Sequence, residues 1–257
     1  ELMEWIRRYW IIGGMPEAVR LFVETRDLAR VTRVHDSILQ NFRDDFGKYA
    51  NRVRHPELEK VFHAAPKQAG SKFQYKRVDP ESGARELKQA LALLVKAGVL
   101  RQVFRTSAGQ PPLAAGIRPN HFKMLCLDIG LMTTQIGMGG ELFRSTDLLS
   151  AWNGAVAEQF VGQEITAYSS PYRQPELFFW GKEEKTGHAE IDYIIQKEGK
   201  VFPIEVKSNA PGQLKSLNRF LEKYASSGNG LRFCARPYKK EERFTSYPLY
   251  AVAKVMQ

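Results

Sequence analysis

The sequence predicts a mixed α/β (α+β) protein, with a helical N-terminal region followed by a mixed sheet flanked by helices. Apolar residues recur at helical spacing through residues 1–50 and again through residues 84–97. Short apolar or alternating runs bounded by Gly and Pro dominate residues 176–250, which is typical of strands. With 257 residues, of which 43% are hydrophobic, the chain has enough apolar material for two domains.

Residues 1–50 are expected to form helices. The first helix breaks at Gly13-Gly14, and Pro16 suits the first turn of the next one. A longer helix then follows from Asp27, because apolar residues recur every three or four positions up to Phe42.

Residues 51–137 are expected to hold a short helix, an extended piece over residues 71–78, and an amphipathic helix that Gly98 ends. A strand follows, and this order indicates a winged helix-turn-helix. The second helix would then present Lys88 and Lys96 to DNA, although winged helices also dock proteins. Residues 107–121 are predicted to be a loop, and Asp128 is predicted to cap the next helix.

Residues 138–257 show the order α-β-β-β-α-β, with a domain boundary expected near residues 138–147. The second helix of this segment is expected to have Asn209 as its N-cap and Pro211 in its first turn. Two more strands are predicted at the C-terminus, the last within "YPLYAVAKV".

The stretch "HAEIDYIIQKEGKVFPIEVKSN" reads as a hairpin with charged residues inside its strands. A turn centred on Glu198-Gly199, with Gly199 at positive φ, would pair Asp192 with Glu205. It would also pair Glu190 with Lys207, which puts all four charges on one face. Pro203 cannot donate a hydrogen bond to its neighbour, so a bulge or broken bond is expected nearby.

The net charge of +10 favours an anionic partner, most often nucleic acid. The helix after the hairpin carries a basic stripe that could follow a phosphate backbone or simply be solvated: Lys215, Arg219 and Lys223. Cys126 and Cys234 lack metal-ligand spacing and are expected to be reduced thiols of a cytoplasmic protein. No apolar run is long enough to predict a membrane span.

The acidic strand, the Glu205-Val206-Lys207 triplet and the upstream Glu158 resemble the PD-(D/E)XK nuclease superfamily, whose core has the same element order. The resemblance covers about residues 148–257 and implies a restriction-endonuclease-like sheet. It implies that Asp192 and Glu205 bind a divalent metal, Mg²⁺ or Mn²⁺, that Glu158 completes the metal shell, and that Lys207 is the electrostatic catalyst. These residue types suit the chemistry, because hard cations prefer carboxylate oxygens and a lysine can hold a phosphate oxygen.

A second resemblance spans nearly the whole chain and rests on ordered motifs: "YWIIGGMPEAV", "ILQNFRDDFGKYA", "FKMLCLDIGLM", "GAVAEQFVGQEI" and "AEIDYII…PIEVKSN". Together they resemble the C-terminal half of prokaryotic AAA-type P-loop ATPases that end in a domain of unknown function. This implies a lid-like segment at 1–50, a winged-helix-like region at 51–137 and a nuclease-like domain at 138–257. It also implies an N-terminal AAA-type ATPase domain missing from this chain. No G-x-x-x-x-G-K-[ST] motif occurs, so no ATP site is expected here.

Two functions follow from these patterns. The first is a metal-dependent endonuclease acting on DNA. The second is a catalytically inactive module of the ATPase that binds DNA or protein. A purely structural alternative remains, in which Lys207 only forms salt bridges with Glu190 and Asp192 on the face of a sheet. Against it, three carboxylates around one lysine leave negative charge that costs free energy unless a cation or protons bind.

Overall fold

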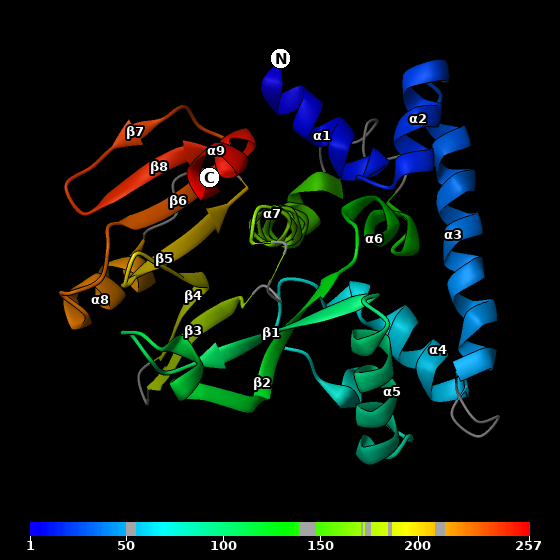
Figure 1. Ribbon diagram of the computed structural model, residues 1–257, viewed down its shortest axis with the longest axis horizontal. Helices are drawn as coiled ribbons and strands as arrows, with labels where there is room; N and C mark the ends of the chain where they lie inside the picture. Colours follow the sequence, from blue (N-terminus) through cyan, green and yellow to red (C-terminus); the bar gives the residue numbers. More distant parts are fainter. Residues whose placement is uncertain (50–54, 139–147, 171, 173–175, 185–186, 209–213) are drawn as a thin grey trace. The chain divides into compact units, whose positions relative to one another are not determined.

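The computed structural model describes residues 1–257 except 50–54, 139–147, 171, 173–175, 185–186 and 209–213. The predicted fold class is confirmed: helices dominate the N-terminal region and a mixed sheet with helices follows (Figure 1). The chain forms two compact units, one of Glu1–Gln102 and Met124–Trp152, the other of Val103–Lys123 and Asn153–Gln257. The units therefore interleave along the sequence, whereas the sequence analysis expects consecutive segments.

The first unit is mainly helical, and its helix ends follow the signals in the sequence. Its helices are α1 (Leu2–Ile12), α2 (Pro16–Thr25), α3 (Leu28–Tyr49), α4 (His55–Ala64), α5 (Ala84–Lys96) and α6 (Ile129–Gln135). Gly13 follows α1 with a φ of 66°, and Pro16 opens α2 as predicted. Gly98, after α5, has a φ of 75°, which a residue without a side chain adopts freely.

Asp128 ties two distant parts of the first unit together. Its Oδ1 accepts a hydrogen bond from the backbone N–H of Leu131 at 3.0 Å, which confirms the predicted cap of α6. Its Oδ2 accepts from the N–H of Gly14 at 2.7 Å. Beside it, a Cβ on Gly130 would lie 2.7 Å from the backbone nitrogen of Gly13. The close contact of α1 with α6 therefore requires glycine at position 130.

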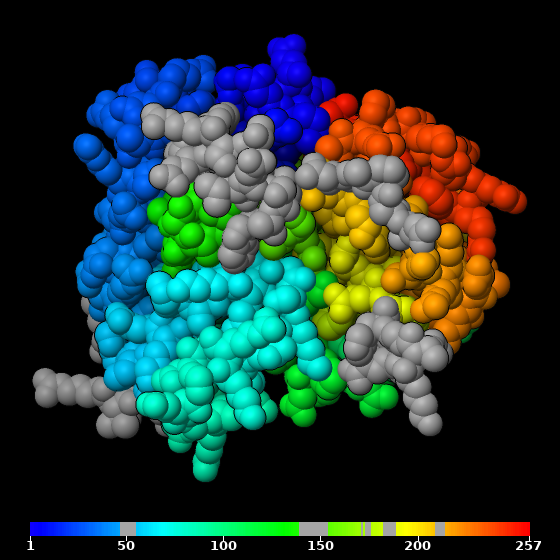
Figure 2. All heavy atoms as spheres, turned by 180° about the vertical axis from the view of Figure 1, so that it is seen from behind, coloured from blue at the N-terminus to red at the C-terminus, as the bar shows by residue number. Residues whose placement is uncertain are grey.

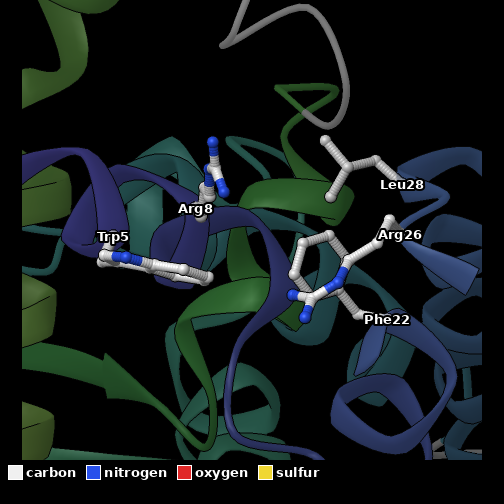
Figure 3. Close-up of a pocket in the computed structure, with 5 residues that line it drawn as sticks. All are labelled: Trp5, Arg8, Phe22, Arg26 and Leu28. Atoms are coloured by element: carbon white, nitrogen blue, oxygen red, sulfur yellow. The ribbon is translucent and has the colours of Figure 1, made fainter. Parts of the chain in front are cut away.

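A cavity of about 450 Å³ in the first unit has a lining of aromatic and cationic side chains (Figure 3). The guanidinium carbon of Arg8 lies 4.8 Å from the centre of the Trp5 ring, and that of Arg26 lies 5.3 Å from the centre of the Phe22 ring. The arginines thus cover ring faces while their charges remain near water. None of the predicted site residues lines this cavity.

Two segments differ from their predicted structure. Residues 71–78 are extended only in part, because a 3₁₀ turn occupies Tyr75–Arg77. The side chain of Gln68 contacts the residue before this turn, because its Oε1 accepts a hydrogen bond from the N–H of Gln74 at 2.9 Å. The predicted loop over residues 107–121 is shorter than expected, since strand β2 already begins at Ile117.

The second unit is built on an eight-stranded mixed sheet in the order β2-β1-β3-β4-β5-β6-β8-β7 (Figure 1). Strand β4 is antiparallel to both of its neighbours, β3 and β5, while β1–β3, β5–β6 and β6–β8 pair in parallel. The strands are β1 (Leu100–Thr106), β2 (Ile117–Cys126), β3 (Phe178–Glu184), β4 (Gly187–Lys197), β5 (Lys200–Lys207), β6 (Gly230–Cys234), β7 (Lys239–Lys240) and β8 (Phe244–Pro248).

Helices α7 (Leu148–Ala167) and α8 (Lys215–Lys223) lie on opposite sides of the central strands (Figure 1). On the α8 side, Ile191 and Ile194 share a core cluster with Leu217 and Phe220. On the α7 side, the hydroxyl of Tyr193 donates a hydrogen bond to the backbone carbonyl of a helix residue at 2.9 Å. The predicted order α-β-β-β-α-β is present as α7-β3-β4-β5-α8-β6.

The β4–β5 hairpin has the predicted register. Tyr193 pairs with Ile204, Ile194 with Pro203, and the ladder continues to Lys197 and Lys200. The turn residues Glu198 and Gly199 have φ values of 52° and 73°. Pro203 keeps its place in the ladder opposite Ile194, and the bulge lies in the pairing of β4 with β3.

The C-terminal segment is only partly extended. Strand β8 ends at Pro248, and "LYAVAKV" forms a 3₁₀ turn and helix α9 (Val252–Met256) instead of continuing the predicted strand. Pro248, whose ring fixes its φ, is the residue at which the strand ends and the 3₁₀ turn begins. Helix α8 begins at Lys215, and the predicted cap Asn209 and Pro211 lie outside the described residues.

Two expectations about the whole chain can be compared with the described residues. Both cysteines are free, buried thiols, as predicted. Among the helices in the described part of the chain, none combines the length and the apolar character that crossing a membrane requires.

Candidate functional site

The candidate site lies in the second unit, where β4 is bulged. The pairing of β3 with β4 shifts between Phe178–Ile194 and Trp180–Ile191, so two residues of β4, Asp192 and Tyr193, lie opposite one residue of β3. Such a bulge interrupts the strict alternation of faces and re-aims side chains. It explains how Ile191 and Ile194, three positions apart, both reach the α8 side of the sheet.

On β5, Glu205 and Lys207 form an ion pair, with Nζ of the lysine 2.6 Å from Oε1 of the glutamate. Glu205 is 6% exposed, whereas the side chain of Lys207 is 33% exposed. The glutamate is thus held inside the unit while the amine reaches the solvent. In the rear view, atoms of the β4–β5 hairpin reach the surface next to those of α8 (Figure 2).

Asp192 connects the acidic strand with this triplet. Its Oδ2 accepts a hydrogen bond from the backbone N–H of Val206 at 2.8 Å. The carboxylate therefore lies beside the backbone between Glu205 and Lys207, which are the neighbours of Val206 in the chain. Among the described residues the ladder of β4 with β5 ends at Tyr193 and Ile204, so it does not include the predicted pairs Asp192–Glu205 and Glu190–Lys207.

Lys123, on β2, is the main residue that the sequence analysis missed. Its Nζ lies 2.7 Å from Oε1 of Glu158 and 2.6 Å from Oε1 of Glu190, and 3.8 Å from Oδ1 of Asp192. It is only 2% exposed, and three carboxylates hold its pKa above the usual value against the effect of burial. A signal was present in the sequence: one lysine inside the otherwise apolar run "FKMLCL".

Glu158 faces the sheet from α7, as predicted, and is 8% exposed. Burial, together with the charges of Asp192 and Glu190, raises its pKa to about 8, although Lys123 opposes the shift. The backbone carbonyl of Glu158 accepts the hydrogen bond from Tyr193 that fixes this turn of the helix on β4. The carboxylate of Glu158 itself is held by its ion pair with Lys123.

The ion pairs of the site contain more carboxyl groups than ammonium groups. Four carboxyl groups (Glu158, Glu190, Asp192 and Glu205) face two ammonium groups (Lys123 and Lys207) in these ion pairs. Burial and the negative charge of Asp192 raise the pKa of Glu205 to about 7, despite its pairing with Lys207. Among the described residues, Oε2 of Glu205 is buried without a hydrogen-bond partner. An excess of buried negative charge retains protons or attracts a cation.

The residues present fit a divalent cation in part. Within the described part of the chain, no group of three or more His, Cys, Asp or Glu side chains is placed to hold a metal ion. Lys123 already occupies the carboxylate of Glu158, which the resemblance assigns to the metal shell. Asp192 and Glu205 remain, and Mg²⁺ often binds through one or two carboxylates and several waters.

The other charged candidates do not join this cluster. Lys88 and Lys96 are exposed on α5 in the first unit. Lys215, Arg219 and Lys223 are exposed on α8, opposite a buried leucine face, as predicted. The ammonium of Lys223 lies 5.9 Å from the centre of the Trp180 ring, so part of this stripe packs on the unit itself. The side chain of His188 lies outside the described residues.

Comparisons with known proteins give families without an assigned function. A family model described as Domain of unknown function (DUF8612) matches residues 3–142, and one described as Domain of unknown function (DUF4143) matches residues 153–252. The crystal structure of protein VC1899 from Vibrio cholerae is similar at 11% identity with a TM-score of 0.27, over 88% of this chain and 54% of that one. The chain thus spans about half the length of that protein. No curated protein matches.

Proposed function

This chain belongs to the family described as Domain of unknown function (DUF8612), and we propose that its second unit is a metal-dependent nuclease acting on DNA. The observation that carries the proposal is the buried carboxylate of Glu205. One of its oxygens has no partner among the described residues, and its pKa is raised to about 7 by burial and by Asp192. A carboxylate left in this state next to a second acid is what a cation-binding site needs.

Asp192 and Glu205 would hold the cation, and each is fixed by the fold. The hydrogen bond from the N–H of Val206 orients Asp192, and the ion pair with Lys207 orients Glu205. A divalent ion bound there would lower the pKa of a water molecule and stabilise charge on the phosphoryl group. Lys207, one-third exposed, would donate a hydrogen bond to a phosphate oxygen of the substrate.

DNA and an N-terminal AAA-type ATPase domain are the proposed partners. The net charge of +10 supports an anionic partner, and the exposed basic residues on α5 and α8 supply contacts for a phosphate backbone. The ordered motifs shared with AAA-type ATPases support the second partner. In such an arrangement this chain would supply the nuclease and winged-helix-like parts, with ATP bound elsewhere.

The test is cleavage of plasmid, linear and branched DNA by the intact chain with Mg²⁺ or Mn²⁺ and with EDTA. We expect cleavage that requires the metal and is lost in Asp192→Ala and Lys207→Ala. Lys200→Ala is the matched control, because it removes the same charge from the exposed end of the same strand. Cleavage that persists in both site variants would reject the assignment.

A second candidate function, a catalytically inactive module that binds DNA or protein, is favoured by Lys123. This ammonium group lies within 2.7 Å of two carboxylates and takes a place that a metal could otherwise occupy. Calorimetry separates the two functions. The absence of binding heat with Mn²⁺, together with salt-sensitive DNA binding, would favour the inactive module.

A further inference from the structure

Arg232 is a half-buried cation that the proposed mechanism does not use. It lies on β6, where its Cα is the register partner of Glu205 in the parallel pairing of β5 with β6. Its Nε and Nη2 atoms are buried and, among the described residues, have no hydrogen-bond partner. A guanidinium group remains charged at all ordinary pH values. Donors left unpaired on a buried charge cost free energy, so their retention calls for an explanation.

Arg232 has a second cation and a carboxylate in its surroundings. Lys207 lies close enough for the charge of Arg232 to oppose the effect of the carboxylates on the lysine's pKa. The neighbouring Glu205 presents an unpartnered oxygen of its own, and yet no hydrogen bond joins it to Arg232. One carboxylate oxygen and two guanidinium nitrogens, none with a hydrogen-bond partner among the described residues, therefore lie on register-paired residues. A ligand that carries anionic oxygens and a cation would satisfy both.

We propose that Arg232 and Lys207 together bind the non-bridging oxygens of a DNA phosphodiester, which makes Arg232 a phosphate-binding residue of the site. The planar guanidinium fork matches two phosphate oxygens, whereas the ammonium of Lys207 supplies a single charge. This inference rests on the proposed function for its substrate. The anion site itself requires only the two basic side chains and no metal.

The test is fluorescence anisotropy of a labelled DNA duplex with the intact chain in EDTA over a range of salt concentrations. Arg232→Met replaces the charge with an apolar chain of similar length, and Arg236→Met is the control because Arg236 is exposed two residues beyond β6. We expect Arg232→Met to weaken binding about tenfold and to lower the salt slope by about one. Arg236→Met should change affinity less than about twofold.

Thermal unfolding of the same variants separates a binding role from a structural one. A purely structural arginine would lower the melting temperature when replaced, whereas Arg232→Met should keep or raise it, because it removes unpaired buried donors. The inference is overturned if Arg232→Met binds DNA like the wild type, if it loses affinity only along with a lowered melting temperature, or if the wild type binds no DNA at low salt.

The outcome also separates this inference from the proposed nuclease. Loss of binding in Arg232→Met without any metal-dependent cleavage by the wild type would support the anion site and reject the nuclease. Cleavage that depends on Asp192, with KM and affinity unchanged in Arg232→Met, would support the nuclease and reject the role of Arg232.

Discussion

The carboxylate of Asp192 accepts a hydrogen bond from the backbone N–H of Val206 at 2.8 Å, and this bond joins the acidic strand to the Glu-x-Lys triplet. The acceptor is a charged carboxylate, so this bond is stronger than a bond to a neutral backbone carbonyl would be. It also holds one oxygen of Asp192 in place. Asp192 therefore has two properties, an oxygen that accepts the hydrogen bond from Val206 and a negative charge. The two properties can be separated by substitution.

Asp192→Asn tests the charge of this residue. Asparagine keeps an oxygen that can accept from Val206, so the fold should be retained, while the negative charge that attracts a cation is lost. We expect Mn²⁺ affinity to fall at least about tenfold, measured by calorimetry near pH 8. Glu190→Gln is the control because it removes an equal charge from a side chain that is 45% exposed. An equal loss in both variants would mean that Asp192 acts only through long-range charge.

Lys123→Met should destabilise the protein strongly. It leaves Glu158, Glu190 and Asp192 without their shared cation, and losing one partner of a buried ion pair costs about 3–5 kcal/mol. The loss should be largest at pH 8 and smaller at pH 6, because the remaining acids can take up protons in the folded state. Urea denaturation at both pH values measures it.

The double variant Lys123→Met/Glu158→Gln provides the comparison for this prediction. It removes both members of the most buried pair, so it should be more stable than Lys123→Met alone by about 1 kcal/mol or more at pH 8. A Lys123→Met protein as stable as the wild type at pH 8 would show that the lysine is not the counter-ion of this cluster.

Local patterns predicted the hairpin well, because the information lies within about twenty residues. The two apolar runs and a turn centred on Glu198-Gly199 were enough for the register and the turn. The capping role of Asp128 was likewise readable from its place before a helix. In each case the partner in the structure is a near neighbour in the chain.

The missed features depend on residues far apart in the sequence. Lys123 is separated in the sequence by 35 residues or more from the carboxylates that it contacts. The sheet order β2-β1-β3-β4 brings these strands, distant in the chain, into one sheet. The bulge at Asp192 arises between β3 and β4, so neither strand alone shows it. Arg232 gains significance only because parallel pairing puts it beside Glu205. Tertiary pairing of this kind leaves no local pattern.

His35 should make the first unit sensitive to acid. It is fully buried, with Nε2 3.0 Å from the carbonyl oxygen of Ile12 and Nδ1 2.9 Å from Oγ1 of Thr134. Burial lowers its pKa below the ordinary value of 6.5, although the charges of Asp128 and Asp36 oppose the shift. The unfolded chain then binds more protons than the folded one below about pH 6.5, so this contribution to stability falls as the pH falls.

The measurement compares the wild type with His35→Asn by urea denaturation between pH 5 and pH 8. The carboxyls of Glu158 and Glu205 have raised pKa values, so their contributions change with pH in the opposite sense. The difference between the two proteins isolates the histidine, because both contain these acids. We expect the difference in unfolding free energy to shrink toward pH 5. A difference that does not depend on pH would show that His35 titrates normally.

Glu198→Asn should stabilise the hairpin that carries Glu205 and Lys207. Glu198 and Gly199 both have positive φ, at 52° and 73°, which is the backbone of a type I′ turn. Asparagine tolerates this conformation better than glutamate, so we expect a gain of about 0.5–1 kcal/mol in the free energy of unfolding. Glu198→Gln removes the same charge next to Lys197 and Lys200 without the conformational benefit and should show no such gain. Equal stability of the Asn and Gln variants would show that charge, and not backbone conformation, governs residue 198.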